Sequence, residues 1–140
     1  MIVIDTNILI SALIKDSITR KIIIESSLNF AYPEISLYEI IKHKDYILKK
    51  GNYNRSEFNT ILNRLLEYIN LIPLNVTKLK LDEAKEVMKD IDINDTAFLA
   101  TALALDKSTI WSDDTDFEKQ KIVKILKTKD MARIFEKWKL

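Results

Sequence analysis

Short apolar runs alternate with longer stretches of helical periodicity along this chain. The first run, Ile2-Val3-Ile4, is short and β-branched, which is typical of a buried strand. Runs of the same kind predict further strands at 28–32, 71–72, 109–112 and 122–126. Apolar residues spaced three and four apart predict helices at 8–14, 17–26, 36–50, 55–69, 76–89, 96–105 and about 130–138. Strands and helices therefore alternate along the chain.

This alternation predicts an α/β fold, a three-layer α/β/α sandwich with a mostly parallel central sheet and helices on both faces. Helix 96–105 is almost wholly apolar and rich in alanine, so we expect it to be buried on most sides. Gly51, the only glycine, follows helix 36–50, where a left-handed C-cap is expected. No repeat, linker or low-complexity segment interrupts the pattern, so residues 1–140 are expected to form a single domain.

The composition excludes several classes of protein. Hydrophobic residues make up 47% of the chain and charged residues 31%, which is ordinary for a globular protein and unlike a disordered one. There is no cysteine and one histidine, so disulfides and Cys/His zinc sites are not expected. Any metal would be held mainly by oxygen ligands, which favours Mg²⁺, Mn²⁺ or Ca²⁺. The net charge of +1 neither requires nor excludes a nucleic-acid partner.

No segment suits a membrane span or an export signal. The apolar runs are shorter than the roughly 18 residues that a membrane helix needs. Asp5 interrupts the first apolar run and no basic segment precedes it, so a signal peptide is not expected. We therefore expect a cytoplasmic protein.

Acidic residues recur where predicted strands end and predicted helices begin. Asp5 ends the first strand, and Glu39 lies near the start of the helix after the second. The aspartates before helix 96–105 and after strand 109–112 are Asp92, Asp95, Asp113, Asp114 and Asp116. In an open parallel sheet, sites form beyond the carboxyl ends of the strands. We therefore expect these acids to meet at one edge of the sheet.

Several carboxylates in one pocket repel one another, and some would stay protonated unless their charge is offset. A divalent cation removes the conflict, because its charge dominates the local electrostatics. Hard oxygen ligands of this kind suit Mg²⁺ or Mn²⁺. The chemistry typical of such a site is phosphoryl transfer, in which the metal acidifies a water and offsets charge on phosphate oxygens.

Each acid also has a structural interpretation. Asp5 could cap the helix that follows it, because aspartate is common at N-caps. Ser36 and Glu39 have the spacing of a capping box, in which the glutamate bonds back to the N-cap amide. Asp92 suits an N-cap better than a metal site, and Asp, Ser and Thr after strand 109–112 also form ordinary turns.

A basic stretch with interleaved tyrosines surrounds Gly51. It consists of Lys42, Lys44, Tyr46, Lys49, Lys50, Tyr53 and Arg55. Such cations could contact an RNA backbone, and the rings could stack on unpaired bases. The alternative is a solvated helix end whose charges favour the helix dipole. His43 could transfer protons but better fits a solvated helix residue, since carboxylate–metal chemistry does not need it.

Four segments in chain order resemble the motifs of the PIN-domain family. The opening strand of that family is similar to Met1-Ile-Val-Ile-Asp-Thr-Asn-Ile-Leu-Ile10, and its second acidic motif to Ser36-Leu-Tyr-Glu-Ile-Ile41. The third motif, which opens an alanine-rich helix, resembles Asp92-Ile-Asn-Asp-Thr-Ala-Phe-Leu-Ala100, and the fourth resembles Ile110-Trp-Ser-Asp-Asp-Thr-Asp-Phe117. Each motif is weak by itself, whereas all four in this order are quite specific.

The resemblance implies a metal-dependent ribonuclease, and many members of the family are VapC-type toxins of prokaryotic toxin–antitoxin pairs. The acidic quartet, catalytic and metal-binding, corresponds to Asp5, Glu39, Asp95 and Asp114, and an additional metal ligand to Asp116. We expect the side chains that brace and orient these ligands to be Thr6, Asn7 and Ser112. The expected cofactor is Mg²⁺ or Mn²⁺, and the expected partners are RNA, a cognate antitoxin and a second copy in a homodimer.

One departure from the family's pattern affects the fourth motif. The family often has Thr-Gly-Asp where this chain has Ser112-Asp113-Asp114, so an extra carboxylate crowds the site. The choice between the two aspartates stays open, although Asp114 lets Trp111 to Phe117 align without a gap.

Other functions remain as alternatives. A housekeeping RNA-processing PIN nuclease would use the same site, and a non-catalytic PIN module would bind nucleic acid or protein. A haloacid-dehalogenase-type phosphatase would need Asp-x-Asp after the first strand, whereas Asn7 occupies the second position here. The sequence leaves open the RNA target, the number of metal ions and the oligomeric state.

Overall fold

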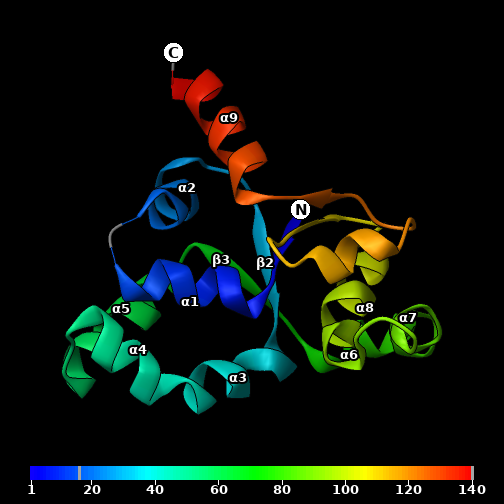
Figure 1. Cartoon of the computed structure of the whole chain (residues 1–140), viewed down its shortest axis with the longest axis horizontal. Coiled ribbons are helices and arrows are strands. Elements are labelled where there is room, and N and C mark those ends of the chain that lie inside the picture. Colours follow the sequence, from blue (N-terminus) through cyan, green and yellow to red (C-terminus); the bar gives the residue numbers. More distant parts are fainter. Residues whose placement is uncertain (16, 140) are drawn as a thin grey trace.

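A five-stranded parallel sheet forms the centre of the computed structural model, which describes residues 1–15 and 17–139 except for the side chains of residues 93, 138 and 139 (Figure 1). The strand order is β3-β2-β1-β4-β5, and every neighbouring pair is parallel. The strands are β1 (Ile2–Ile4), β2 (Phe30–Pro33), β3 (Ile69–Ile72), β4 (Thr109–Trp111) and β5 (Ile125–Leu126). The expected parallel sheet is confirmed.

Helices fill the connections between the strands. The first two connections hold α1 (Thr6–Ile14), α2 (Ile18–Glu25), α3 (Leu37–Lys42), α4 (Lys44–Gly51) and α5 (Arg55–Leu66). The third holds α6 (Leu74–Thr77), α7 (Leu81–Met88) and α8 (Thr96–Ala104), and α9 (Thr128–Lys139) follows β5. Short 3₁₀ turns lie at η1 (Glu34–Ser36), η2 (Lys78–Lys80), η3 (Ile93–Asp95) and η4 (Thr115–Lys119).

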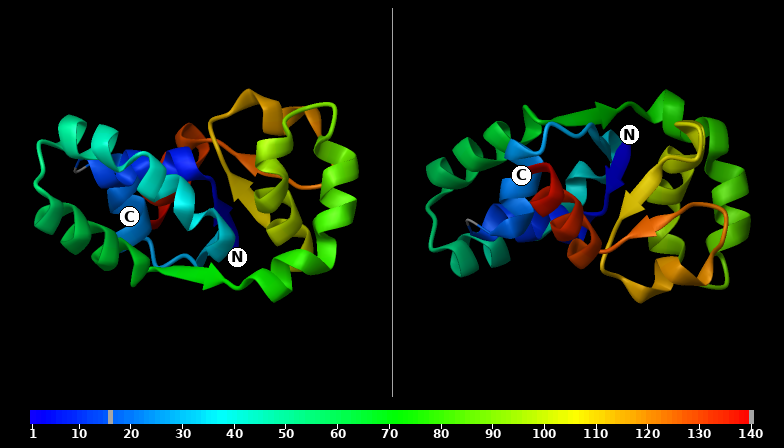
Figure 2. Two further views of the ribbon diagram at one scale, coloured as in Figure 1. Left: turned by 90° about the horizontal axis from the view of Figure 1, so that it is seen from below. Right: turned by 90° about the horizontal axis from the view of Figure 1, so that it is seen from above.

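The strand order explains why helices cover both faces of the sheet. From β1 the chain moves outward through β2 to β3, and it then returns across the sheet to β4 and β5. Because crossovers between parallel strands are right-handed, this reversal carries the later helices to the opposite face. Accordingly, α8 contacts β1, β2 and β4 on one face, whereas α1, α2 and α5 pack together on the other (Figure 2). This is the expected three-layer sandwich.

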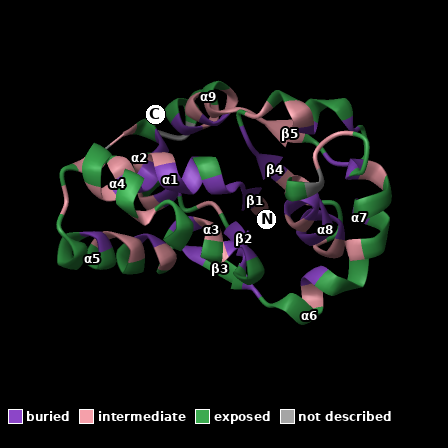
Figure 3. Ribbon diagram, turned by 60° about the horizontal axis from the view of Figure 1, so that its bottom comes forward, coloured by how far each residue is buried: buried purple, intermediate pink, exposed green. Residues whose placement is uncertain are grey.

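Residues of the sheet and of two helices, α1 and α8, form most of the core (Figure 3). Phe30, Ile110 and Trp111 are fully buried in the strands. Helix α8 is buried along most of its length, as its apolar composition predicts, because it lies directly on three strands. Within the described part of the chain, no helix combines the length and the apolar character of a membrane span.

One predicted helix is divided in two. The stretch 36–50 forms α3 and α4, separated at His43, whose backbone (φ −95°, ψ 11°) is not helical. No glycine or proline marks this break in the sequence. Helix α4 packs against α1 and α5, whereas α3 contacts α1 and η1. The prediction of one continuous helix is wrong because packing in the fold, rather than a helix-breaking residue, sets the boundary.

The predicted left-handed cap at Gly51 is also wrong. Asn52 adopts that conformation (φ 56°, ψ 46°), which asparagine tolerates, and Gly51 is the last residue of α4. The glycine is needed for space, because a Cβ at this position would lie 2.1 Å from Cε2 of the Tyr53 ring.

Other boundaries move for identifiable reasons. Helix 55–69 ends at Leu66, since Ile69 opens β3, and the stretch 76–89 is shared by α6, η2 and α7. The strand predicted at 122–126 begins only at Ile125. The side-chain oxygen of Gln120 accepts hydrogen bonds of 3.0 Å from the backbone amides of both Ile122 and Val123, which occupies those amides before the strand starts.

Candidate metal centre

The order in which the chain adds strands to the sheet reverses between β1 and β4, and such a switch point is where open parallel sheets form sites. Asp5 follows β1, and Ser112 begins the segment after β4. Ile4 pairs with Trp111 in the sheet register, and the Asp5 amide donates to the Trp111 carbonyl at 3.2 Å. Two motifs far apart in the sequence therefore lie side by side at the carboxyl edge of the sheet.

Asp5 is 5% exposed and hydrogen-bonded through both carboxylate oxygens. Its Oδ1 accepts a hydrogen bond of 2.9 Å from the Ile8 amide, and its Oδ2 accepts one from the hydroxyl of Ser112. Burial raises the pKa of Asp5 to about 6, against the effect of these two hydrogen bonds, and the charge of Asp114 raises it further. Asp5 thus caps α1 and also joins the acidic edge, so its two interpretations are compatible.

Asp95, at the start of α8, has the most perturbed carboxyl group of the edge. Burial raises its pKa to about 7, and the negative charges of Asp92, Asp114 and Asp5 add to the shift. Among the described residues, its Oδ2 is buried without a hydrogen-bond partner. A buried oxygen in this state loses its hydration without compensation, which is costly unless a proton or a cation is bound.

Three carboxylates form a tight cluster beside these two. The ligand atoms of Asp92, Asp114 and Asp116 all lie within 4.8 Å of one another. Asp92 also accepts a hydrogen bond of 2.9 Å from the Asn94 amide, so the capping role expected for it coexists with membership of the cluster. No sign of the cluster at Asp92 is present in the sequence, because its position before a helix has a sufficient local explanation.

The two adjacent aspartates after β4 have different surroundings. Asp113 accepts hydrogen bonds from the Thr128 amide at 2.8 Å and the Thr128 hydroxyl at 2.6 Å, and it thereby fastens the start of α9. The amide of Asp114 instead donates to the Ser112 hydroxyl oxygen at 3.0 Å, and its carboxylate lies in the cluster. The geometry favours Asp114 as the fourth acid of the site and a structural role for Asp113.

Glu39 is linked through Thr6 to the segment that carries Asp5, and it is not a member of the cluster of Asp92, Asp114 and Asp116. The Thr6 hydroxyl is 3.1 Å from Oε1 of Glu39 and 2.8 Å from the Tyr32 hydroxyl, which donates to the Ser36 carbonyl at 2.9 Å. Ser36 forms no side-chain cap hydrogen bond, so the capping box suggested by the sequence is not formed. Sequence reasoning missed Tyr32; the signal was a polar ring near the carboxyl end of an otherwise apolar strand.

The carboxyl group of Glu39 is half-buried and accepts a hydrogen bond of 3.1 Å from the Thr6 hydroxyl. Burial raises the pKa of Glu39, against the effects of the Thr6 hydrogen bond, the charges of His43 and Lys42, and a hydrogen bond from the Ser36 side chain. Glu39 therefore holds its proton more tightly than an exposed glutamate does.

The remaining expected residues lie around this edge. Ser112 is buried and contacts both Asp5 and Asp114, as a bracing residue should. Asp116 also forms an ion pair of 2.9 Å with Lys119. Asn7 is exposed and lines a groove between α1 and α4; within the described residues it forms no hydrogen bond to an acid, so the orienting role expected for it finds no support in the contacts.

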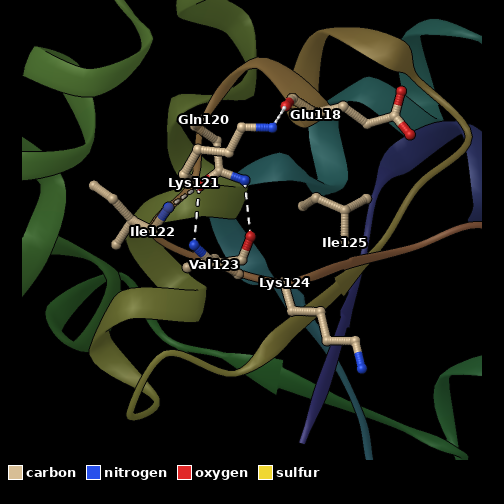
Figure 4. A pocket seen from close by; sticks show the side chains of 7 residues that line it. All are labelled: Glu118, Gln120, Lys121, Ile122, Val123, Lys124 and Ile125. Carbon is tan, nitrogen blue, oxygen red and sulfur yellow. Dashed lines mark hydrogen bonds between the residues drawn. The ribbon is translucent and has the colours of Figure 1, made fainter.

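A hollow of about 550 Å³ over the loop between η4 and β5 contains none of the candidate acids (Figure 4). Its shape follows from the folding of the loop on Gln120, whose side-chain amide donates to the carbonyls of Phe117 and Val123 at 2.9 Å each. We therefore place the candidate site at the acidic edge and not in this hollow.

The acidic edge fits a hard divalent cation. Its donors are carboxylate oxygens, which Mg²⁺ and Mn²⁺ prefer. Within the part of the chain that the structure describes, Oδ2 of Asp95 has no hydrogen-bond partner, and the pKa values of Asp5 and Asp95 are raised; both observations indicate uncompensated negative charge. A divalent ion would supply the missing positive charge.

The chain is similar to known proteins in sequence pattern and in fold. A protein-family model described as PIN domain matches residues 3–135. The crystal structure of VapBC2 from Rickettsia felis, bound to a DNA fragment from its promoter, shares the fold with a TM-score of 0.69 and 18% identity over 91% of this chain and 98% of that one. A toxin–antitoxin complex from Klebsiella pneumoniae has a TM-score of 0.63 and 20% identity over 91% of this chain and 98% of that one. No curated protein sequence matches the chain.

Proposed function

The chain belongs to the PIN-domain family, and from this premise we propose that it is a ribonuclease that depends on Mg²⁺ or Mn²⁺. The observation that carries the proposal is the meeting of acids from separate segments at one edge of the sheet. Burial and mutual repulsion raise the pKa of Asp5 to about 6 and that of Asp95 to about 7. A divalent cation is the charge that allows such acids to be ionised together near neutral pH.

We assign catalysis and metal binding to a defined set of acids. The proposed ligands, direct or through water, are Asp5, Glu39, Asp95, Asp114 and Asp116, to which the cluster adds Asp92. When bound, the ion would offset charge on the phosphate oxygens and make a nearby water more acidic. Several of these acids would act through water, because Mg²⁺ takes only one or two carboxylates directly.

Neighbouring side chains fix the acids in place before substrate arrives. The Ile8 amide and the Ser112 hydroxyl hold the two oxygens of Asp5. Thr6 holds Glu39, and Tyr32 holds Thr6. Such supporting contacts orient ligands, and losing one typically costs tenfold to about 100-fold in metal affinity or activity.

We further propose that the protein is the toxin of a toxin–antitoxin pair, acting in the cytoplasm as one domain, with an antitoxin partner and as a homodimer. The shared fold with two toxin–antitoxin proteins supports this role. Growth arrest on expression, relieved by the product of a neighbouring gene, is the result expected of a toxin. RNA cleavage without growth arrest would favour the housekeeping alternative.

Purified protein is expected to cleave single-stranded RNA in the presence of Mn²⁺ or Mg²⁺, to stop when EDTA is added and to resume when metal is restored in excess. The reason is that the acids repel each other and the phosphate unless a cation is bound. Gel analysis of labelled RNA, with DNA of the same sequence as a control, measures this. Cleavage that persists under chelation contradicts the metal requirement, and absence of cleavage with both metals favours a non-catalytic module.

A further inference from the structure

We propose that the groove between α1 and α4 leads single-stranded RNA to the acidic edge, with Tyr46 stacking on a base and Lys15 and Lys50 contacting phosphates. The groove has a volume of about 530 Å³ and is lined by both helices. The proposal rests on the proposed ribonuclease function and adds to it the surface that holds the substrate.

Helix α1 supplies one wall and the floor of the groove. Asn7 and Ser11 line it four residues apart, on one face of the helix, and Lys15 lines it directly after the helix ends. Ile10 and Ile14 lie between them and form an apolar floor. From Asn7 to Ile14, the last residue of α1, the wall is roughly 10 Å long at the usual rise of a helix.

Residues of α4 and the break before it supply the opposite wall. His43, Tyr46 and Lys50 line it at spacings of three and four residues, which again places them on one face. Tyr46 is 51% exposed, so its ring is accessible to a base. The His43 ring is held by a hydrogen bond of 2.8 Å that its Nδ1 donates to the Glu39 carbonyl.

Both walls begin at the acidic edge. Asn7 is two residues beyond Asp5, and His43 is bonded to the backbone of Glu39. Thr6 joins the two segments, since its hydroxyl contacts the carboxylate of Glu39 at 3.1 Å. A strand lying in the groove would therefore have one end beside the candidate metal centre.

The lining has the charge that a nucleic acid requires. It carries two lysines and a histidine and, among the residues that the structure describes, no carboxylate. In that part of the chain neither lysine forms an ion pair. Cations that track a backbone, together with an exposed ring, are the features with which proteins bind single strands. A hydrophobic groove is the usual site for a protein helix, whereas the aliphatic residues of this lining are the two isoleucines Ile10 and Ile14.

The residues of the basic stretch around Gly51 make different contacts in the structure. The Tyr53 hydroxyl donates to the Ile14 carbonyl at 3.0 Å and accepts from Arg20 at 3.1 Å, so this tyrosine fastens α1 to the start of α5. The ammonium of Lys44 lies 5.4 Å from the centre of the Phe58 ring. Of the stretch, Tyr46 and Lys50 line the groove, which makes them the residues to test.

Fluorescence anisotropy with a labelled single-stranded RNA tests the proposal, with Ca²⁺ in place of Mg²⁺ because it takes the same oxygen ligands. Tyr46→Ala is expected to weaken binding about tenfold, and to weaken binding of duplex RNA less, because paired bases are not free to stack. Lys15→Gln combined with Lys50→Gln should lower the slope of log affinity against log salt by about 1.4. Tyr68→Ala and Lys124→Gln, exposed residues outside the groove, are the matched controls and should leave affinity within about twofold.

Cleavage by the same proteins is measured separately with Mn²⁺, so that the two proposals can fail independently. If the wild type cleaves RNA and the groove variants bind RNA as tightly as the wild type does, the proposed groove is overturned and the proposed nuclease stands. If the wild type cleaves no RNA but binds it, and the groove variants bind it more weakly, the proposed groove is supported and the proposed nuclease is overturned. If the groove variants lose a co-purifying protein while their RNA binding is unchanged, the groove is a protein interface and the proposal is overturned. A wild type that binds no RNA also overturns the proposal.

Discussion

Asparagine in place of Asp114 is expected to lower metal-dependent RNA cleavage by on the order of 100-fold or more, because a proposed ligand loses its charge. Asp114 belongs to the cluster whose ligand atoms lie within 4.8 Å of one another. Asparagine keeps the Oδ1 acceptor that bonds the Asp116 amide at 2.9 Å, so the turn after β4 should persist. The expected loss is therefore one of charge and not of structure.

The same substitution at Asp113 is the matched control. Asp113 accepts hydrogen bonds from the amide and the hydroxyl of Thr128, at 2.8 and 2.6 Å, and so acts on α9. Asp113→Asn should lower the free energy of unfolding by about 1 kcal/mol and change cleavage by less than about threefold. Urea unfolding and cleavage rates of both variants check this. A large loss of cleavage in Asp113→Asn with little in Asp114→Asn would reverse the assignment of the fourth acid.

The metal-free protein is expected to lose stability, by on the order of 2 kcal/mol, as the pH rises from about 4 to about 7. Folding raises the pKa of Asp5 from 3.8 to about 6 and that of Asp95 from 3.8 to about 7. A raised pKa means that the folded state holds its proton more tightly, so the stabilisation is complete below 3.8 and is lost as the pH passes the folded-state values. Because the two acids repel each other, they titrate as a coupled pair and their contributions do not simply add.

Urea unfolding in EDTA at about pH 4 and about pH 8 measures this loss. Mn²⁺ is expected to raise the Tm by several degrees at the higher pH and little at the lower, because metal binding needs ionised carboxylates. Asp5→Asn should flatten the pH dependence, whereas Asp82→Asn, at an exposed acid of α7, should not. Stability that increases with pH in EDTA, or equal stabilisation by Mn²⁺ at both values, would contradict the account.

Local pattern was enough to predict the elements that build the acidic edge. Ile2-Val3-Ile4 followed by Asp5 predicts a buried strand with an acid at its carboxyl end, and both features depend on adjacent residues. The apolar helix 96–105 is similar, because a helix without a polar face can only be buried. Their parallel arrangement follows from general rules of chain crossover.

Features that depend on distant neighbours were not predictable in this way. The break at His43 has no helix-breaking residue, and the hydrogen bond from its ring to the Glu39 carbonyl exists only once α3 has ended there. Tyr32 takes its role from Thr6, which lies 26 positions earlier in the chain. The choice between Asp113 and Asp114 depended on Thr128, whose position against the first of them only the fold defines.

The account's central claim is that acids from separate segments hold one divalent ion together, and anomalous scattering from a crystal containing Mn²⁺ tests it most directly. The expected result is a peak bounded by Asp114 and at least one of Asp5 and Asp95, and its loss in Asp114→Asn. A peak confined to acids elsewhere on the surface, or no peak in the wild-type crystal at saturating Mn²⁺, would contradict the claim.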